Sequence, residues 1–190
     1  NDVEAIDAAQ NCLYIMSDMP NIKRFEPYLT APPYRTMPSS SREKDPVGAV
    51  DRERLHNYLL PIDCPRVTFY ALPTSTHEDI ERFMGLSSAK YVVAVESRWM
   101  ARIQQERLYR YDVPKDTFTM VGTGAGGHWL SQTAVVPLAE TLIDNLLTAL
   151  VARDVELRVL PSLWPLHDAV MPSTLHHSMI RMRNAIRRES

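Results

Sequence analysis

The spacing of hydrophobic residues changes along the chain and predicts a mixture of strands and helices. Residues 90–97 read KYVVAVES, and a continuous Val-rich run of this kind is typical of a strand buried on both faces in the middle of a sheet. In residues 107–113, Leu108 and Arg110 alternate with Tyr109 and Tyr111, as in a strand whose two faces differ. The same criteria predict strands near residues 12–16, 66–72, 117–122, 128–132, 134–138 and 177–184, the last with a cationic face.

Other segments carry apolar residues at helical spacing. The clearest is 75–85, where Ser75 or Thr76 can cap the N-terminus and acidic residues follow in the first turn. Gly85 is placed to end this helix. Further helices are predicted at 50–60, 97–105 and 138–154, the last with a stripe of leucines along one side.

These elements predict an α+β fold, with a single domain built on a mixed, mostly antiparallel sheet of six to eight strands flanked by helices. Strands and helices do not alternate regularly enough to require a doubly wound fold. The domain is assigned to residues 12–186, with an N-terminal extension at 1–11 and a tail at 187–190. The segment 26–46 contains five prolines and a triple Ser, so it predicts a long surface loop and a candidate lid.

Composition and charge narrow the class of function. The chain has 190 residues, a formal net charge of −2 and a sequence pI near 6.3, without the excess of Lys and Arg that nucleic-acid binding requires. No apolar run approaches the roughly 20 residues of a membrane span, and the first ten residues lack the pattern of a signal peptide. We therefore expect a cytoplasmic protein with no nucleic-acid or membrane partner, and the oligomeric state stays open.

Four of the six glycines stand directly before a His-Trp pair, in the sequence GTGAGGHWLS at residues 122–131. Glycines allow positive φ angles and a close approach of the backbone, so such a turn can present N–H donors to an anion. His128 would then act as a general acid or base at the rim, and Trp129 could stack on the ligand. A flexible hairpin tip with a surface histidine explains the same residues equally well. The spacing matches neither a dinucleotide-binding turn nor a Walker loop.

A carboxylate and three arginines complete the candidate site. Glu96 ends a buried strand, where a low dielectric would raise its pKa and suit proton exchange near neutrality. The alternative is a Glu that favours the start of the next helix and pairs with Arg98. The guanidinium groups at Arg66, Arg158 and Arg181 match carboxylate or phosphate in a bidentate manner, although surface ion pairs are the commoner use.

Cysteines and histidines show no metal-ligand pattern. Two cysteines are too few for a disulfide framework, and no Cys or His pair has the spacing of zinc ligands, so no metal site is expected. Cys64 lies near Arg66, which would lower the thiol pKa, but a nucleophile also needs a base. A buried structural thiol is the better interpretation.

Four longer stretches carry a resemblance: YLLPIDCPRVTF, ESRWMARI, LYRY, and ELRVLPSLWPLHDAVMPSTL followed by SMIRMRNA. They resemble a family of uncharacterised, mostly bacterial proteins filed as a domain of unknown function, over roughly residues 12–185. The patterns W-P-L-x-D-A-V and I-R-x-R-N-A are its most specific motifs.

Members of that family often open with a pattern like L-Y-H-F-S, which resembles the first strand of the ADP-ribosyltransferase-like fold. A His or Arg on that strand holds NAD in the latter fold, and Ile15 stands at this position here. The resemblance implies a domain that binds NAD or a related nucleotide, active or degenerate, with Tyr14 and Ser17 beside the nucleotide.

Three hypotheses of function follow. The first is a metal-independent enzyme without a cofactor, a lyase, isomerase, cyclase or transferase that acts on a polar or anionic small molecule. In it His128 and Glu96 move protons while the arginines hold the anion. The second is the ADP-ribosyltransferase-like domain with NAD as its ligand. The third is a non-catalytic interaction domain.

Overall fold

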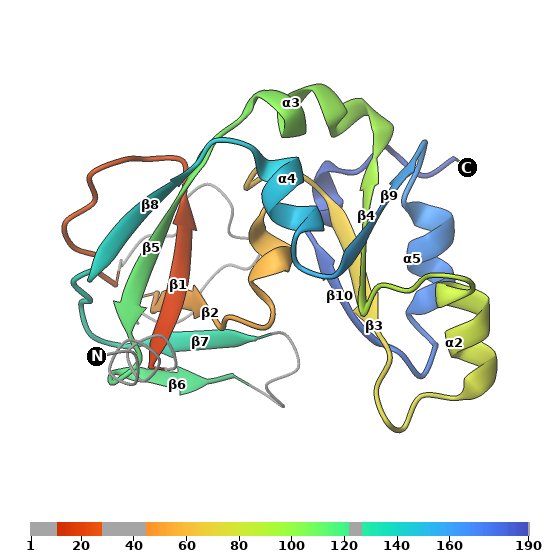
Figure 1. The fold of residues 1–190 in the computed structure, drawn as a ribbon, viewed down its shortest axis with the longest axis horizontal. Coiled ribbons are helices and arrows are strands. Elements are labelled where there is room, and N and C mark those ends of the chain that lie inside the picture. Colours follow the sequence, from red (N-terminus) through yellow and green to blue (C-terminus); the bar gives the residue numbers. More distant parts are fainter. Residues whose placement is uncertain (1–10, 28–44, 122–126, 190) are drawn as a thin grey trace. The chain divides into compact units, whose positions relative to one another are not determined.

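The computed structural model describes residues 11–27, 45–121 and 127–189, and its ribbon is drawn in Figure 1. Over these residues the chain forms ten strands, the four α-helices α2 to α5 and three short 3-10 helices. The predicted α+β class is confirmed, and the strands are mostly antiparallel. They form two sheets, of six and of four strands, where the sequence predicted one.

The chain divides into two compact units. Unit 1 consists of residues 1–55 and 109–142, and unit 2 consists of residues 56–108 and 143–190. Each sheet belongs essentially to one unit.

Unit 1 is built on the six-stranded sheet, whose strand order is β6-β7-β2-β1-β5-β8. Strand β1 pairs antiparallel with both β2 and β5, and β7 pairs antiparallel with β2 and β6. The strands are β1 (Cys12–Ser17), β2 (Val47–Val50), β5 (Leu108–Pro114), β6 (Phe118–Met120), β7 (His128–Ser131) and β8 (Ala139–Ile143). Alternate residues of these strands form an apolar cluster together with Val135, which lies between β7 and β8. The strand residues are Leu13, Val47, Ala49, Val113 and Phe118.

The helix predicted at 50–60 is wrong. Strand β2 ends at Val50, and only a short 3-10 helix, η1 (Leu55–Tyr58), follows. Asp51 explains the difference, because its backbone N–H donates to the carbonyl of Gly127 at 3.0 Å. Its Oδ1 accepts from the Arg54 N–H at 3.0 Å, so the polar groups here form a turn next to the sheet.

The long helix predicted at 138–154 is also wrong. Residues 139–143 form strand β8, and the helix that follows, α4 (Leu146–Val151), is short. Asn145 sets its start, since Oδ1 of Asn145 accepts from the Thr148 N–H at 3.0 Å and caps the helix. The strand predicted at 134–138 is reduced to an isolated bridge between Phe25 and Val135.

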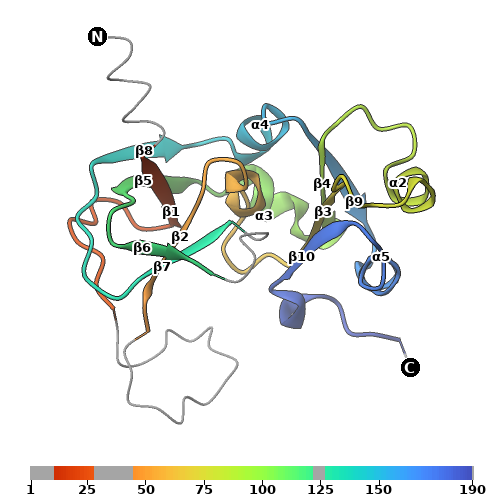
Figure 2. The same ribbon diagram turned by 90° about the horizontal axis from the view of Figure 1, so that it is seen from below.

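Unit 2 is built on the four-stranded sheet, whose order is β10-β3-β4-β9 (Figures 1 and 2). Strand β4 runs antiparallel to β3 and parallel to β9, and β10 is antiparallel to β3. The strands are β3 (Arg66–Tyr70), β4 (Tyr91–Glu96), β9 (Val155–Leu160) and β10 (His176–Ile180). Every residue of β4 is buried, which confirms the central strand that the Val-rich run predicted.

Helices α2 (His77–Met84) and α5 (Trp164–Val170) lie together on one side of this sheet in both views (Figures 1 and 2). Their side chains share an apolar cluster with one face of the sheet, formed by Val67, Phe69, Phe83, Met84, Val92, Ala94, Leu163, Val170 and Leu175. The residues that alternate with these on β4, Val93 and Val95, are fully buried on the opposite face. Short helices α3 (Met100–Gln105) and α4 contact each other, and α4 contacts β9.

Helix α2 follows its predicted boundaries closely. The Thr76 hydroxyl accepts from the Asp79 N–H at 3.2 Å, and Gly85 ends the helix with a φ of 47°. These signals lie within the segment itself, which is why the sequence was sufficient to predict them.

The strand predicted at 177–184 is too long. Strand β10 ends at Ile180, because Arg181 adopts a left-handed backbone with φ of 56°, and the 3-10 helix η3 (Met182–Asn184) follows. Arg181 therefore stands after the strand, and no row of arginines forms on one face of β10.

Gly127 is the one glycine of the Gly-rich stretch within the described residues, and its conformation requires glycine. It has a φ of 67°, and a Cβ there would lie 2.7 Å from Cδ and 2.8 Å from Cβ of Arg54. Gly122, Gly124 and Gly126 lie outside the described residues.

We expect Gly127→Ala to lower the free energy of unfolding by about 1–2 kcal/mol for the left-handed backbone alone, with a further loss from displacing Arg54. Urea denaturation of the purified protein measures this change. The matched control is Gly48→Ala in β2, where the nearest atom to the new Cβ is 3.9 Å away. That variant should keep or raise stability, because Ala restricts the unfolded chain. Equal stabilities of the two variants would contradict the argument.

Candidate functional site

The residues that the sequence singled out are divided between the two units. His128 and Trp129 belong to unit 1, whereas Glu96 and the three candidate arginines belong to unit 2.

His128 begins strand β7, with its Cα opposite that of Val50. The residue is exposed, yet the part of the ring that packs against the protein lowers its pKa below the usual 6.5, while the negative charge of Asp51 opposes this change. A histidine in this state is mostly neutral at pH 7 and can accept a proton.

Trp129 contributes to the core of unit 1. It lies opposite Ala49 on β2 and packs against the apolar cluster, and the Lys115 ammonium lies 4.2 Å from its ring centroid. This cation–π contact covers one ring face, so the geometry favours a packing role over ligand stacking.

Glu96 is fully buried at the end of β4, and its carboxylate is occupied by three donors. Oε1 accepts from Arg98 Nε at 3.2 Å and from the Ile186 N–H at 3.0 Å. Oε2 accepts from the Leu163 N–H at 3.3 Å and from the same Ile186 N–H at 3.2 Å. The carboxylate thus joins β4 to the start of α5 and to the C-terminal segment, and the pairing with Arg98 that the sequence offered as an alternative is present.

Arg66 is only 1% exposed, and its guanidinium donates to backbone carbonyls. Nε donates to Cys64 at 2.9 Å, Nη1 to Asn57 at 2.8 Å and Nη2 to Pro61 at 2.6 Å. Burial also lowers its pKa to about 10. The side chain holds the loop before β3 in place and does not present its donors to a ligand.

The thiol of Cys64 has no character of a nucleophile. It is fully buried, and burial raises its pKa to about 11 despite the nearby charge of Arg66. At neutral pH the thiolate is scarce, which agrees with a structural role.

Arg158 and Arg181 do not share a binding surface. Arg158 lies on β9 and Arg181 follows β10, and these are the two edge strands of the four-stranded sheet. Three strand spacings of about 4.8 Å place the two strands roughly 14 Å apart. Among the predicted arginines, Arg158 lines the two hollows that the described residues form beside β9.

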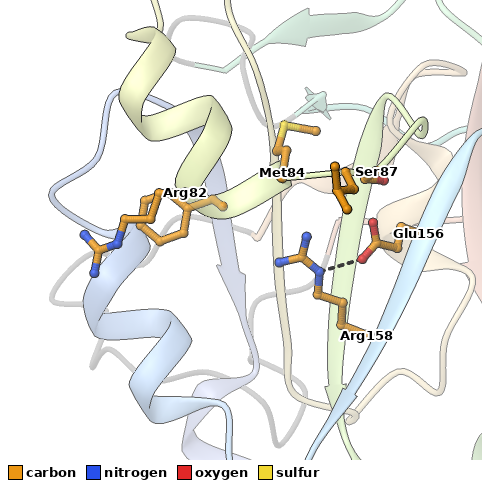
Figure 3. Close-up of a pocket in the computed structure, with 8 residues that line it drawn as sticks. Arg82, Met84, Ser87, Glu156 and Arg158 are labelled. Carbon is orange, nitrogen blue, oxygen red and sulfur yellow. Dashed lines mark hydrogen bonds and ion pairs between the residues drawn. The ribbon is translucent and has the colours of Figure 1, made fainter.

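Two adjoining hollows open beside the β9 edge, and both are lined by Arg82, Phe83 and Arg158. The first, drawn in Figure 3, has a volume of about 430 Å³ and a polar wall that includes Ser87 and Glu156. The second has a volume of about 560 Å³, and its lining is mainly apolar. Its further residues are Leu160, Pro161, Ser162, Pro165, Leu166 and Ala169.

The Arg158 side chain is held in a defined orientation. Its Nε donates to Oε1 of Glu156 at 2.7 Å, and its guanidinium carbon lies 5.6 Å from the centroid of the Phe69 ring. Nη1 and Nη2 make no hydrogen bond within the described part of the chain, and Figure 3 shows them turned away from Glu156. The pair of terminal nitrogens that binds carboxylate or phosphate is thus available.

Glu156 is charged over the whole neutral range. Hydrogen bonds from Arg158 and from Ser87 lower the pKa of its carboxyl below the usual value. Its negative charge therefore stands beside the Arg158 guanidinium at one end of the first hollow.

Sequence reasoning missed Arg82, Ser87 and Glu156. The sequence Glu-Leu-Arg at 156–158 carried a signal, because residues two apart on a strand lie on one face and opposite charges there form a pair. Arg82 had no such signal, since its place depends on how α2 packs on the sheet.

The comparison with family models gives a match over residues 14–185 to a family described as a "family of unknown function (DUF6886)". The chain belongs to this family. No curated protein and no solved structure matched it. The resemblance expected from the sequence motifs is therefore confirmed at the level of the family.

Within the described ranges, no three His, Cys, Asp or Glu side chains come together as metal ligands. None of the helices in the described part of the chain has the length and apolar character needed to cross a bilayer. Tyr14, expected beside a nucleotide, is buried in β1 with the Arg110 guanidinium carbon 5.0 Å from its ring centroid.

Glu96→Gln is expected to lower the free energy of unfolding by about 1–3 kcal/mol. In either orientation the Gln amide nitrogen meets a backbone N–H that the carboxylate accepted, so two donors face each other in a buried site. Chemical denaturation measures the loss, with the exposed Glu78→Gln on α2 as control. A stable Glu96→Gln variant would show that the carboxylate is dispensable.

The pKa of His128, followed by NMR titration, should lie below 6.5 and fall further in Asp51→Asn, because the Asp51 charge favours the imidazolium. Between the folded pKa and 6.5 the unfolded chain binds more protons than the folded one. The stability contributed by neutral His128 is thus complete above 6.5 and is lost as the pH falls through that window. His128→Gln should remove this dependence, and a pKa above 6.5 would contradict it.

Proposed function

We propose that unit 2 binds a small organic anion with an apolar body in the two adjoining hollows beside β9. The observation that carries the proposal is the state of Arg158, whose Nε is fixed by Glu156 while Nη1 and Nη2 are turned away and available. A guanidinium in this state is a ready bidentate partner for a carboxylate or phosphate.

The charges around the hollows favour an anion. Arg82 makes no hydrogen bond or ion pair within the described residues, and its guanidinium carbon lies 4.9 Å from the Phe83 ring centroid. Among the residues that line the hollows, Arg82 and Arg158 carry two positive charges and Glu156 carries one negative charge. Outside the lining, hydrogen bonds and, to a lesser extent, the Arg82 charge lower the pKa of Asp79. The excess of one positive charge attracts an anion from solution.

The apolar lining accounts for the body of the ligand. Side chains of Leu160, Pro165 and Leu166 line the second hollow, next to the arginines. Volumes of about 430 and 560 Å³ are in the usual range for small-molecule sites. An acid with an aromatic or branched aliphatic body matches this combination of surfaces.

The enzyme hypothesis stays a prediction. Glu96 is committed to three donors, so it offers no free carboxylate for acid/base work. His128 keeps suitable proton chemistry, but it belongs to the other unit. Binding needs neither residue, and it is therefore the function that the geometry supports best. NAD binding and an interaction role are the competing hypotheses.

The probes are 3-phenylpropanoate and 4-methylpentanoate, titrated into ¹⁵N-labelled full-length protein. We expect saturable shifts of backbone amides in residues 82–87 and 156–169. Arg158→Gln should weaken binding by about 10- to 100-fold, since a hydrogen bond to a charged group contributes about 1.5–3 kcal/mol.

The matched control is Arg107→Gln, which removes the same charge from an exposed arginine outside the hollows. It should leave the affinity unchanged. Equal weakening by both variants would reduce the effect to net charge, and absence of any saturable shift would overturn the proposal. Shifts with NAD that map to β1 instead would support the nucleotide-binding hypothesis.

A further inference from the structure

We propose that the ligand of this site is a free α-amino acid with an apolar side chain, whose ammonium binds Glu156 and whose carboxylate binds Arg158. The inference rests on the proposed function: it keeps the carboxylate on Arg158 and the apolar body, and it adds an ammonium group to the ligand. The reason for the ammonium group is the Glu156 carboxylate. A plain anion would leave this carboxylate without a partner and would be repelled by its negative charge.

Glu156 has room for a further donor. An ionised carboxylate offers about four lone-pair sites, and here Arg158 Nε and the Ser87 side chain account for two. The Glu156 side chain is 34% exposed, so the remaining sites reach the solvent side of the hollow. An ammonium group, which carries three donors and a positive charge, is the matching partner.

The two charged groups are close enough for one small molecule. Glu156 and Arg158 lie two residues apart on the same face of β9, and Nε of Arg158 lies 2.7 Å from Oε1 of Glu156. A ligand whose ammonium and carboxylate share one carbon atom can therefore meet both at once. Each of its charges then faces an opposite charge of the protein.

The apolar lining of the second hollow determines which kind of amino-acid side chain fits there. Arg158, Arg82 and Phe83 line both hollows, so a carboxylate held by Arg158 lies at their junction. From there the side chain of the ligand can extend along Leu160 and Leu166. Aromatic or branched aliphatic side chains bury the most apolar surface in such a place.

The test compares L-phenylalanine with 3-phenylpropanoate, which lacks the ammonium, and with L-phenylalaninamide, which lacks the carboxylate. Dissociation constants come from NMR or calorimetric titration of the full chain. We expect phenylalanine to bind at least tenfold more tightly than either analogue. In the Glu156→Gln variant, phenylalanine should bind no more tightly than 3-phenylpropanoate. The Gln amide oxygen still accepts a hydrogen bond from Arg158, but it lacks the negative charge that attracts the ammonium group.

The control is Glu78→Gln, an exposed carboxylate on α2 outside both hollows, which should preserve the preference for phenylalanine. Tighter or equal binding of 3-phenylpropanoate in the unaltered protein would overturn the amino-acid proposal and leave the anion site standing. Failure of every probe to bind would overturn both. Loss of the preference in Glu78→Gln would show that Glu156 does not determine it.

Discussion

The buried carboxylate of Glu96 is the interaction on which the candidate site depends. A charge in a fully buried position is tolerated only when donors surround it, and here two of the three donors are backbone N–H groups from distant parts of the chain. One of them, on Leu163, directly precedes α5. Because α5 supplies the apolar wall of the second hollow, the position of that wall follows from the charge at the end of β4.

The C-terminal segment is held by the same interaction and by several neighbours. Ile186 donates to Glu96, and its carbonyl accepts from Trp164 Nε1 at 2.6 Å. Arg188 forms a bidentate ion pair with Asp168, at 2.6 and 2.9 Å, and lies over the Trp164 ring. Residues that a sequence motif marks as specific, Trp164 and Asp168 among them, thus act in packing and anchoring, which is why a motif alone did not reveal a reaction.

Three arginines in or directly after strands of the four-stranded sheet show how the surroundings of a residue decide its role. The guanidinium group of Arg66 donates its hydrogen bonds to backbone carbonyls of a buried loop. Arg181 adopts a left-handed backbone conformation and ends strand β10. Arg158 is 25% exposed and pairs with a carboxylate through Nε alone. Arg66 and Arg158 are the same residue type, but only Arg158 keeps its terminal nitrogens available for a ligand.

The sequence predicted those features that local interactions decide. Helix α2 and strand β4 were predictable because a cap, a glycine and a Val-rich run lie within each segment. The prediction of one helix over residues 138–154 was wrong because Asn145 caps a helix that begins only in the middle of this segment. The spacing of the leucines does not reveal that the residues before Asn145 form a strand. The hollows could not be predicted, since Arg82 and Arg158 line the same hollows only because α2 packs on the sheet.

Glu156 acts on any ligand in two physically different ways. By holding Nε it restrains an arginine side chain that would otherwise lose up to about 2 kcal/mol of rotamer entropy on binding, and this benefit extends to every anion. By its charge it repels an anion and attracts an ammonium. The two effects oppose each other for a simple carboxylate and add for a zwitterion. The difference in affinity between two such ligands therefore isolates the charge of Glu156, whereas the absolute affinity for either one mixes both effects.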